Sequence, residues 1–380
     1  MVRYSLATVA ISKGAGVYDG IFTRFRQPIS KYFDIGWLGC YYAAMTNSLA
    51  LAAKADVLPG AGLDSESLVA PLKAAADPLR LEILAVLAQN SYGVSELARI
   101  FDVGQSGMSH HLKLLTGAGL TTTRREGNSI FYRRAMLAPG QSLADLQQAL
   151  FASVDQLELR TAIRTQCAAI ASERASASQQ FFAANADKFR AQQDLIASFP
   201  VYGEQVSQLL NNTPLPSRHL ALEVGPGQGE FLPVLAKRFS HVVALDNADE
   251  MLAHSRASAD AAGLVNVEFI LGNTASLADH RVLADCIVMN MVLHHTPSPL
   301  AIFKDLSEAL APGGALLVTD LCRHEQDWAR ANCGDLWQGF EPADFTGWAR
   351  EAGLNEGQSL YIALRNGFQV QLRQFFKPTI

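Results

Sequence analysis

The chain has 380 residues, which is enough for two domains and connecting helices, and hydrophobic residues make up 49% of it. No apolar run approaches the roughly 18 residues that span a bilayer, so we expect a soluble, cytoplasmic protein with no membrane partner. The net charge of −5 argues against a chain that coats nucleic acid, so any contact with DNA must come from a local basic patch.

The five cysteines are scattered, without CxxC spacing or a disulfide rhythm. This distribution fits a reducing cytoplasm and offers no zinc site, so we expect no metal. Residues 1–62 form a poorly defined N-terminal extension in which basic residues alternate with aromatic ones, as in a basic amphipathic arm. An alternative is that translation starts near Met45, which leaves open whether residues 1–44 are translated. No function is assigned to this extension.

The next segment has the pattern of a winged helix-turn-helix. Apolar residues recur at helical spacing over Leu68–Asn90, interrupted by Asp77-Pro78, where the aspartate can cap a second helix and the proline can open it. We expect a short helix over Val94–Phe101 that begins near Ser95, and a recognition helix over Gln105–Thr116. Thr121–Arg125 and Ser129–Arg134, joined by a glycine turn, predict a two-stranded wing.

The recognition helix should bury Met108, Leu112 and Leu115 and turn its polar side chains toward DNA. Between positions 99 and 134 the sequence contains six basic and two acidic residues, which is an excess of four positive charges in an acidic chain. Phosphate binding needs such a local concentration. The residues expected to contact DNA are Gln105, Ser106, Ser109, His110, Lys113, Arg124, Arg125 and Arg133, whereas His111 is interpreted as structural.

Over about residues 66–136 the chain resembles the ArsR/SmtB winged-helix family. The resemblance rests on ADPLRLEIL at 76–84, MSHHLKLL at 108–115, Gly119-Leu120, and RREG at 124–127 with Tyr132. It implies a homodimer that binds double-stranded operator DNA and often releases it when an effector binds. The metal sensors of that family carry a cysteine pair where this chain has Gly93–Leu97, so metal or arsenite sensing is not expected.

Residues 138–198 predict a helical linker that completes a dimer interface. Ser142–Ser198 contains almost no glycine or proline and is rich in Ala, Gln, Leu and Arg. An apolar stripe suited to a partner helix comprises Leu143, Leu146, Leu150, Val154 and Leu157. The aromatic residues Phe181, Phe182, Phe189 and Tyr202 either form a lid over a ligand or fill the joint between domains.

The C-terminal half alternates strands and helices. Leu220–Val224 predicts a buried strand and Phe231–Phe239 a helix, with glycines at 225, 227 and 229 between them. A dinucleotide fingerprint would place glycine where Glu230 stands. Asp246 ends the next strand, where its carboxylate can accept hydrogen bonds from ribose hydroxyls. Further alternation and a closing antiparallel hairpin predict a mostly parallel sheet with the ligand at the carboxyl ends of its strands.

Residues 175–380 resemble a class I S-adenosylmethionine-dependent methyltransferase, through the glycine loop, Asp246, Gly272–Thr274, NMVLHH at 290–295 and Pro312–Gly314. The resemblance implies an adenosyl site formed by Glu223, Gly225, Gly227, Gly229, Asp246, Asn247, Ala248, Asn273, Thr274 and Asn290. Asn273 replaces an aspartate that is common there. His294 and His295 lie where an acceptor would approach and are weak candidates for a catalytic base. Trp328, Trp337 and Phe340 are candidates for the wall on that side.

The sequence thus predicts a multi-domain protein, in which a mostly α winged helix-turn-helix with a small β wing precedes an α/β Rossmann-like methyltransferase domain. The expected segments are 1–62 (extension), 63–137 (winged helix), 138–198 (linker) and 199–380 (methyltransferase-like). Methyl transfer needs orientation rather than an obligatory nucleophile, so the sequence cannot separate an enzyme from a sensor.

Three functions remain open. The leading hypothesis is a homodimeric repressor with S-adenosylmethionine or S-adenosylhomocysteine as effector, controlling methionine-cycle genes. The second is an active small-molecule methyltransferase with an autoregulatory DNA-binding domain. In the third, the second domain is a structural remnant that stabilises the dimer.

Overall fold

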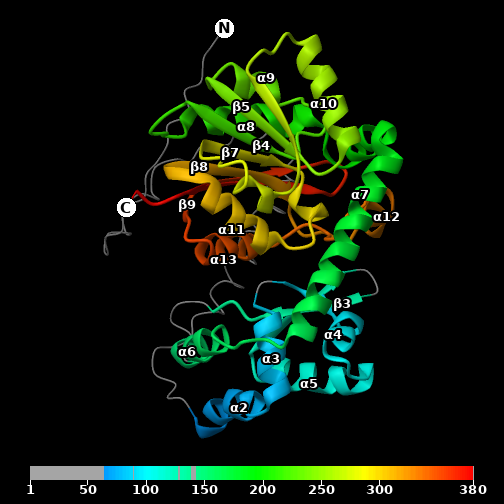
Figure 1. The fold of residues 1–380 in the computed structure, drawn as a ribbon, viewed down its shortest axis with the longest axis vertical. Helices are drawn as coiled ribbons and strands as arrows, with labels where there is room; N and C mark the ends of the chain where they lie inside the picture. Colours follow the sequence, from blue (N-terminus) through cyan, green and yellow to red (C-terminus); the bar gives the residue numbers. More distant parts are fainter. Residues whose placement is uncertain (1–63, 89, 127–128, 138–142, 380) are drawn as a thin grey trace, which may run out of the picture. The chain divides into compact units, whose positions relative to one another are not determined.

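The computed structural model describes residues 64–88, 90–126, 129–137 and 143–379 (Figure 1). The predictions for the extension at 1–62 and for the glycine turn at 127–128 lie outside these residues. Within the described residues, no helix combines the length and the apolar character needed to cross a bilayer.

The winged-helix domain is confirmed as a set of helices around a three-stranded antiparallel sheet of order β1-β3-β2. Its elements are α2 (Ser65–Ala75), α3 (Pro78–Val86), β1 (Tyr92–Gly93), α4 (Val94–Phe101), α5 (Gln105–Gly117), β2 (Thr121–Glu126) and β3 (Ser129–Arg134). As predicted, Met108, Leu112 and Leu115 on α5 are fully buried in the domain core.

Local side chains set where these helices begin. Asp77 accepts a hydrogen bond from the backbone of Arg80 at 3.0 Å, and Pro78 opens α3, as the sequence predicts. The bounds of α4 are as predicted, but its N-cap is Gly93 and not Ser95 or its neighbour. The Gly93 N–H donates to the Glu96 carboxylate at 2.7 Å, which satisfies one of the free donors at this helix end.

The linker region consists of α6 (Ala144–Val154) and α7 (Thr161–Ala197), a helix of 37 residues. On α6 the buried residues are Gln147, Phe151 and Val154, and Phe151 and Val154 belong to the core of the winged-helix domain. Of the predicted stripe, Val154 is buried in this single chain, Leu143, Leu146 and Leu150 are half-buried, and Leu157 is exposed. The dimer contact of the stripe stays a prediction.

The second domain is built on a seven-stranded sheet of order β6-β5-β4-β7-β8-β10-β9. Its strands are β4 (Leu220–Val224), β5 (His241–Asp246), β6 (Val267–Leu271), β7 (Ala284–Asn290), β8 (Leu310–Leu321), β9 (Asn355–Ala363) and β10 (Gln369–Phe376). The first five are parallel, and β9 and β10 form the predicted antiparallel hairpin. The predicted turn at 311–314 lies within β8, where its register with β7 shifts.

Helices cover both faces of this sheet, which explains why its central strands are continuous apolar runs (Figure 1). One face packs against α8 (Phe199–Asn212), α9 (Leu232–Ala236) and α10 (Asp249–Ala261), and the other against α11 (Pro299–Ala309) and α13 (Pro342–Glu351). The helices α8 and α13 and the short α12 (Asp327–Cys333) were not predicted from the sequence. The strand order reverses between β4 and β7, the position at which such sheets bind ligands.

Candidate functional site

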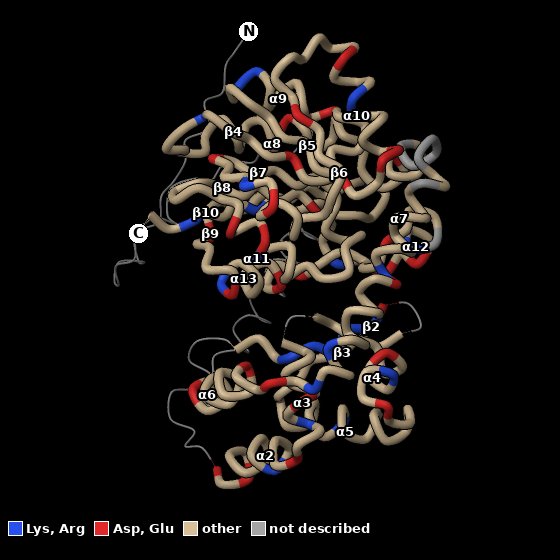
Figure 2. Tube along the Cα trace, viewed as in Figure 1, with Lys and Arg blue, Asp and Glu red and all other residues tan. Residues whose placement is uncertain are grey.

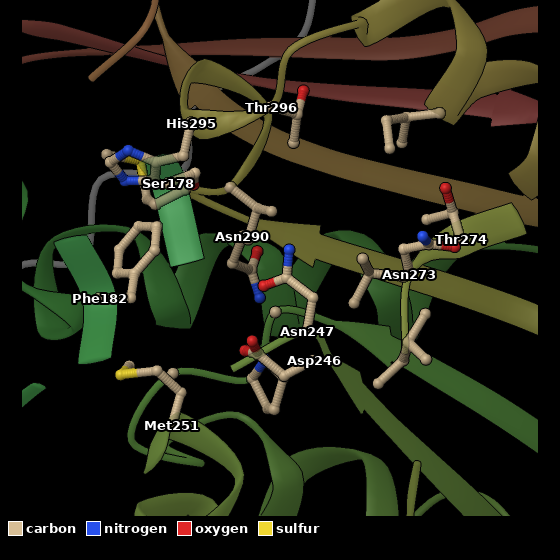
Figure 3. A pocket seen from close by; sticks show the side chains of 18 of the residues that line it. Ser178, Phe182, Asp246, Asn247, Met251, Asn273, Thr274, Asn290, His295 and Thr296 are labelled. Carbon is tan, nitrogen blue, oxygen red and sulfur yellow. The ribbon is translucent and has the colours of Figure 1, made fainter. Parts of the chain in front are cut away.

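A cavity of about 700 Å³ opens at the carboxyl ends of β4, β5 and β7 (Figure 3). The structure brings eight of the ten predicted adenosyl-site residues to its wall, namely Glu223, Gly225, Gly227, Asp246, Asn247, Asn273, Thr274 and Asn290. Gly229 and Ala248 are not among the lining residues. Ala248 is fully buried, and its backbone N–H donates to the Asp246 carboxylate at 2.9 Å.

The glycine loop after β4 requires glycine for two different reasons. Gly225, Gly227 and Gly229 all have positive φ values, between 57° and 74°. A Cβ on Gly225 would lie 2.4 Å from Val292, and one on Gly229 would lie 3.2 Å from the Ser255 backbone, so these two permit close packing. A Cβ on Gly227 would meet no atom within 4 Å, and Gly227 lines the cavity. Its lack of a side chain leaves room for a ligand.

Two carboxyl groups line the cavity, the buried Glu223 and the half-buried Asp246. Burial raises the pKa of Asp246 to about 6, although hydrogen bonds from the Ala248 and Asn247 backbone oppose the shift. Burial also raises the pKa of Glu223 to about 8, and its Oε2 atom accepts no hydrogen bond. A bound ligand that carries hydroxyl or ammonium donors would stabilise both groups in their ionised forms.

Asn290, at the end of β7, is a further polar group prepared for a ligand. It lines the cavity, and neither the oxygen nor the nitrogen of its buried amide makes a hydrogen bond. Buried amides are normally paired, because an unmade hydrogen bond costs about 1–3 kcal/mol. The adenosyl-site prediction for Asn290 is consistent with this position.

The long helix α7 forms one side of the cavity. From the sequence, a position over the ligand was one of two alternatives for Phe182. Ser178, Gln179 and Phe182 line the cavity, and Gln179 donates to the Asn247 carbonyl at 3.1 Å. The Phe182 ring lies edge-on to His295, with centroids 5.1 Å apart (Figure 3). The signal available in the sequence was the adjacent aromatic pair Phe181-Phe182 in a helix rich in Ala, Gln and Ser.

The two candidate histidines occupy different positions. His295 lines the cavity, whereas His294 is not among the lining residues and its Nδ1 lies 2.8 Å from Asp320. Burial lowers the pKa of His294, but Asp320 and Asp335 outweigh it and raise that pKa to about 9. Burial, together with His294, keeps the pKa of His295 well below its usual value, so His295 is neutral.

The aromatic wall predicted for the acceptor side is not found at the cavity. Trp328, Trp337 and Phe340 are not among its lining residues. Trp337 and Phe340 belong to the core on the α11 and α13 face of the sheet, and Trp328 packs against Phe368. Trp328 lies on α12, and Trp337 and Phe340 lie between α12 and α13. Because these two helices were not predicted, the sequence did not show where the three aromatic side chains would pack.

The structure separates the predicted DNA contacts into two groups. Residues Gln105, Ser106, Ser109, His110 and Lys113 are exposed along α5, and Arg125 is exposed on β2. The side chains of Arg124 and Arg133 are instead held by the methyltransferase-like domain. Asp344 pairs with Arg133 at 2.6 Å and with Arg124 at 3.6 Å.

Arg124 is almost completely buried, so it does not offer a free charge to phosphate. Its guanidinium donates to the Glu126 carboxylate and to the Gly339 carbonyl, and it lies over the rings of Trp337 and Phe340. The structure therefore contradicts the expected DNA contact of Arg124. The physical reason is that a salt bridge and two aromatic rings compete with DNA for the same side chain.

The positive charge of this region is smaller in the folded chain than a count along the sequence suggests. Basic residues gather on β2 and β3 (Figure 2), but acidic residues from other segments pair with several of the basic residues between positions 99 and 134. Glu173 pairs with Arg99 at 2.6 Å and Asp155 pairs with Arg134 at 2.5 Å, in addition to the Asp344 contacts. Of the basic residues expected to contact DNA, Lys113 on α5 and Arg125 on β2 are exposed.

Comparison with known families finds one match in each of the two domains. Residues 77–123 match the model described as bacterial regulatory protein, arsR family, and residues 197–356 match the model described as methyltransferase domain. The chain joins an ArsR-family regulatory domain to a methyltransferase domain.

Relatives of the two domains are separate proteins. The ubiquinone biosynthesis O-methyltransferase of Xanthomonas axonopodis pv. citri is 29% identical over 202 residues, which cover 47% of this chain and 82% of that enzyme. The transcriptional activator HlyU of Vibrio cholerae is 41% identical over 69 residues, which cover 18% of this chain and 64% of that regulator. The match thus spans less than two thirds of the regulator's length.

Solved structures include the N-methyltransferase NodS from Bradyrhizobium japonicum in complex with S-adenosyl-L-homocysteine. It is 18% identical, with a TM-score of 0.39, and the match covers 47% of this chain and 88% of NodS.

Proposed function

We propose that this ArsR-family protein is a DNA-binding transcriptional regulator, a repressor, whose methyltransferase domain binds S-adenosylmethionine or S-adenosylhomocysteine as its effector. The adenosyl-site residues and the exposed face of α5 carry the two binding activities. Control of methionine-cycle genes stays a prediction from the family resemblance.

The observation that carries this proposal is that α7 packs in the core of the winged-helix domain and also lines the cavity. Ile163 and Ile170 lie in the core of the winged-helix domain, while Ser178 and Phe182 line the cavity. Between them, Arg174 donates to both oxygens of Glu96 on α4, at 2.9 and 2.6 Å. An effector that contacts α7 therefore acts on an element that also packs against the helix-turn-helix, which gives a physical route for coupling.

The charge of the cavity favours the sulfonium ligand of the two. Five acidic residues are among its described lining residues, and none of those residues is Lys or Arg; the acids are Asp194, Glu223, Glu230, Asp246 and Asp305. Glu223, with its pKa of about 8, adds a negative charge only once a ligand stabilises its ionised form. S-adenosylmethionine carries a positive sulfonium that S-adenosylhomocysteine lacks. We therefore propose that the former binds more tightly.

We further propose that the protein forms a homodimer in which helix α2 of the winged-helix domain contacts the second copy. Leu68, Val69 and Leu72 on α2 are all large apolar residues with exposed fractions between 38% and 49%. A cluster of this kind on one helix favours a contact with a second copy.

An active methyltransferase with an autoregulatory DNA-binding domain is the second candidate. The observation in its favour is the neutral His295 at the cavity wall, because a neutral imidazole can accept a proton from a methyl acceptor. Release of S-adenosylhomocysteine in the presence of candidate acceptors would establish this activity and is independent of DNA binding.

The effector role predicts that operator affinity depends on the ligand. A DNA fragment selected by the full-length chain from genomic fragments would be titrated by fluorescence anisotropy without ligand, with S-adenosylmethionine and with S-adenosylhomocysteine. We expect a change in Kd of about 5- to 150-fold with the effector, the usual range for coupling between two sites. Equal Kd values under all three conditions would refute the effector role.

Asp246 predicts that ligand affinity falls in acid. A protonated carboxyl loses acceptor capacity for ribose hydroxyls, so binding requires the ionised form. Because the pKa of Asp246 is raised to about 6 in the empty cavity, the contribution of Asp246 to the Kd for S-adenosylhomocysteine should be constant above that pH. Below it, the Kd should rise by up to about tenfold per pH unit, as linkage to one proton requires.

Calorimetric titration between pH 5 and 8 measures this dependence, with Asp246→Asn as the control. The variant should bind more weakly and lose the acid-side slope. An unchanged slope in the variant would assign the proton to another group.

A further inference from the structure

A second set of polar side chains lies next to the adenosyl cavity. His294 and His295, on a short 3-10 turn after β7, meet Asp335, which follows α12. One ligand atom from each residue lies within 4.8 Å of the others, and all three residues are buried. Asp335 is 40 residues from His295 in sequence, and the fold brings its carboxylate together with both imidazoles. Such a group of side chains can bind a metal ion.

The distances within this cluster fit a shared ion better than hydrogen bonds. Asp335 Oδ1 lies 3.7 Å from His294 Nε2 and 3.5 Å from His295 Nδ1. Hydrogen bonds between such groups would be about 2.7–2.9 Å long. Two ligands on one tetrahedral zinc ion, each about 2.0–2.1 Å from the metal, lie roughly 3.3 Å apart.

Asp335 adds an independent observation. Its side chain is completely buried, yet neither carboxylate oxygen accepts a hydrogen bond. A buried carboxylate in this condition is costly unless a cation or donor compensates it. His295 Nδ1 lies 3.4 Å from the Gly334 carbonyl, which accepts a hydrogen bond from it when no ion is bound.

Asp320 orients His294 as a metal ligand would need. Its Oδ1 lies 2.8 Å from His294 Nδ1 and accepts from the Leu321 N–H at 2.7 Å. A carboxylate that receives Nδ1–H leaves Nε2 as the coordinating nitrogen, which is the usual arrangement of histidine ligands and their supporting carboxylates.

We propose that His294, His295 and Asp335 bind a divalent transition-metal ion, with zinc as the preferred ion, and that Asp320 is a positioning residue for His294. Imidazole and carboxylate donors suit zinc among the common cellular metals. His295 lines the adenosyl cavity, so the cavity offers the ion a path of entry. When bound, the ion would act as a Lewis acid near the acceptor side of the cavity and fix the wall that His295 and Phe182 form.

The full-length chain, stripped with EDTA, provides the test. Cobalt(II) would be titrated while its visible absorption is followed, and zinc would be titrated against a chromophoric chelator. We expect one ion per chain and a cobalt spectrum of low coordination number. His294→Gln and Asp335→Asn should each weaken zinc binding more than 100-fold, and Asp320→Asn by about 10- to 100-fold, the usual effect of a supporting residue.

Matched controls are His241→Gln and Asp327→Asn, which change the same residue types at positions outside the cluster, and both should bind zinc as the unaltered chain does. Circular dichroism would identify which variants fold, and three altered positions keep the test available if one variant does not. Absence of stoichiometric binding to the unaltered chain, or equal affinity in folded Asp335→Asn, would overturn the proposal.

Discussion

Gly227→Arg is expected to abolish binding of S-adenosylmethionine, with a loss of at least 100-fold in affinity, and to leave DNA binding by α5 intact. No atom lies within 4 Å of the position that a Cβ would occupy on Gly227, so the new side chain can be accommodated. It would, however, project into the cavity that Gly227 lines and fill part of the space for the ligand. Calorimetric titration measures the ligand, and anisotropy with the selected DNA fragment measures the second activity.

Gly263→Arg is the matched control. Gly263 also has a positive φ, 67°, and open space around its Cβ position, but it lies on the surface after α10 and does not line the cavity. Both variants carry the same backbone penalty of about 1–2 kcal/mol for a left-handed residue. Retained ligand binding in Gly227→Arg, or equal loss in Gly263→Arg, would show that the glycine loop is not the ligand site.

Arg124→Ala is expected to lower the free energy of unfolding by about 3–5 kcal/mol, the usual cost of removing one partner from a buried ion pair. The change leaves the fully buried Glu126 without its guanidinium partner and takes a donor from the Gly339 carbonyl. Urea denaturation followed by tryptophan fluorescence suits this test, because the ring of Trp337 lies beneath the Arg124 side chain.

Lys113→Ala provides the contrast. Lys113 is exposed on α5, so its loss should change stability by less than about 0.5 kcal/mol. It should instead reduce by about one the slope of log affinity against log salt concentration for the DNA fragment. If Arg124→Ala lowered the salt slope and left stability unchanged, Arg124 would contact phosphate and would not be held by the methyltransferase domain.

Local signals in the sequence were sufficient for most of the architecture. Asp77-Pro78, the helical spacing of Met108, Leu112 and Leu115, and the glycine loop after β4 each fix a short stretch through neighbours in sequence. Both domains and the parallel sheet followed from them. The helices α12 and α13 were missed because their stability comes from packing against the sheet, where Phe345 and Trp348 are buried, and periodicity alone is weak over ten residues or fewer.

The position of a functional residue was predictable where it depends on the end of a strand or on a glycine loop. It was not predictable where it depends on contacts between segments that are distant in sequence. Asp246 and Asn290 end strands, so their position at one edge follows from the topology. The contacts of Arg124 with Gly339 and Asp344 join positions more than 200 residues apart, and no local pattern announces them. A count of charges along the chain could not detect Asp344 beside Arg133, which is why the basic patch was overestimated.

The length of α7 has a mechanical consequence. A continuous helix of 37 residues is about 55 Å long, so a tilt of about 5° at one end displaces the other by roughly 5 Å. In the homodimer that we propose, the two recognition helices must stay about 34 Å apart to meet successive major grooves of DNA. A shift of that size is enough to put these helices out of step, so a small adjustment around Phe182 can be amplified by leverage alone, without any unfolding.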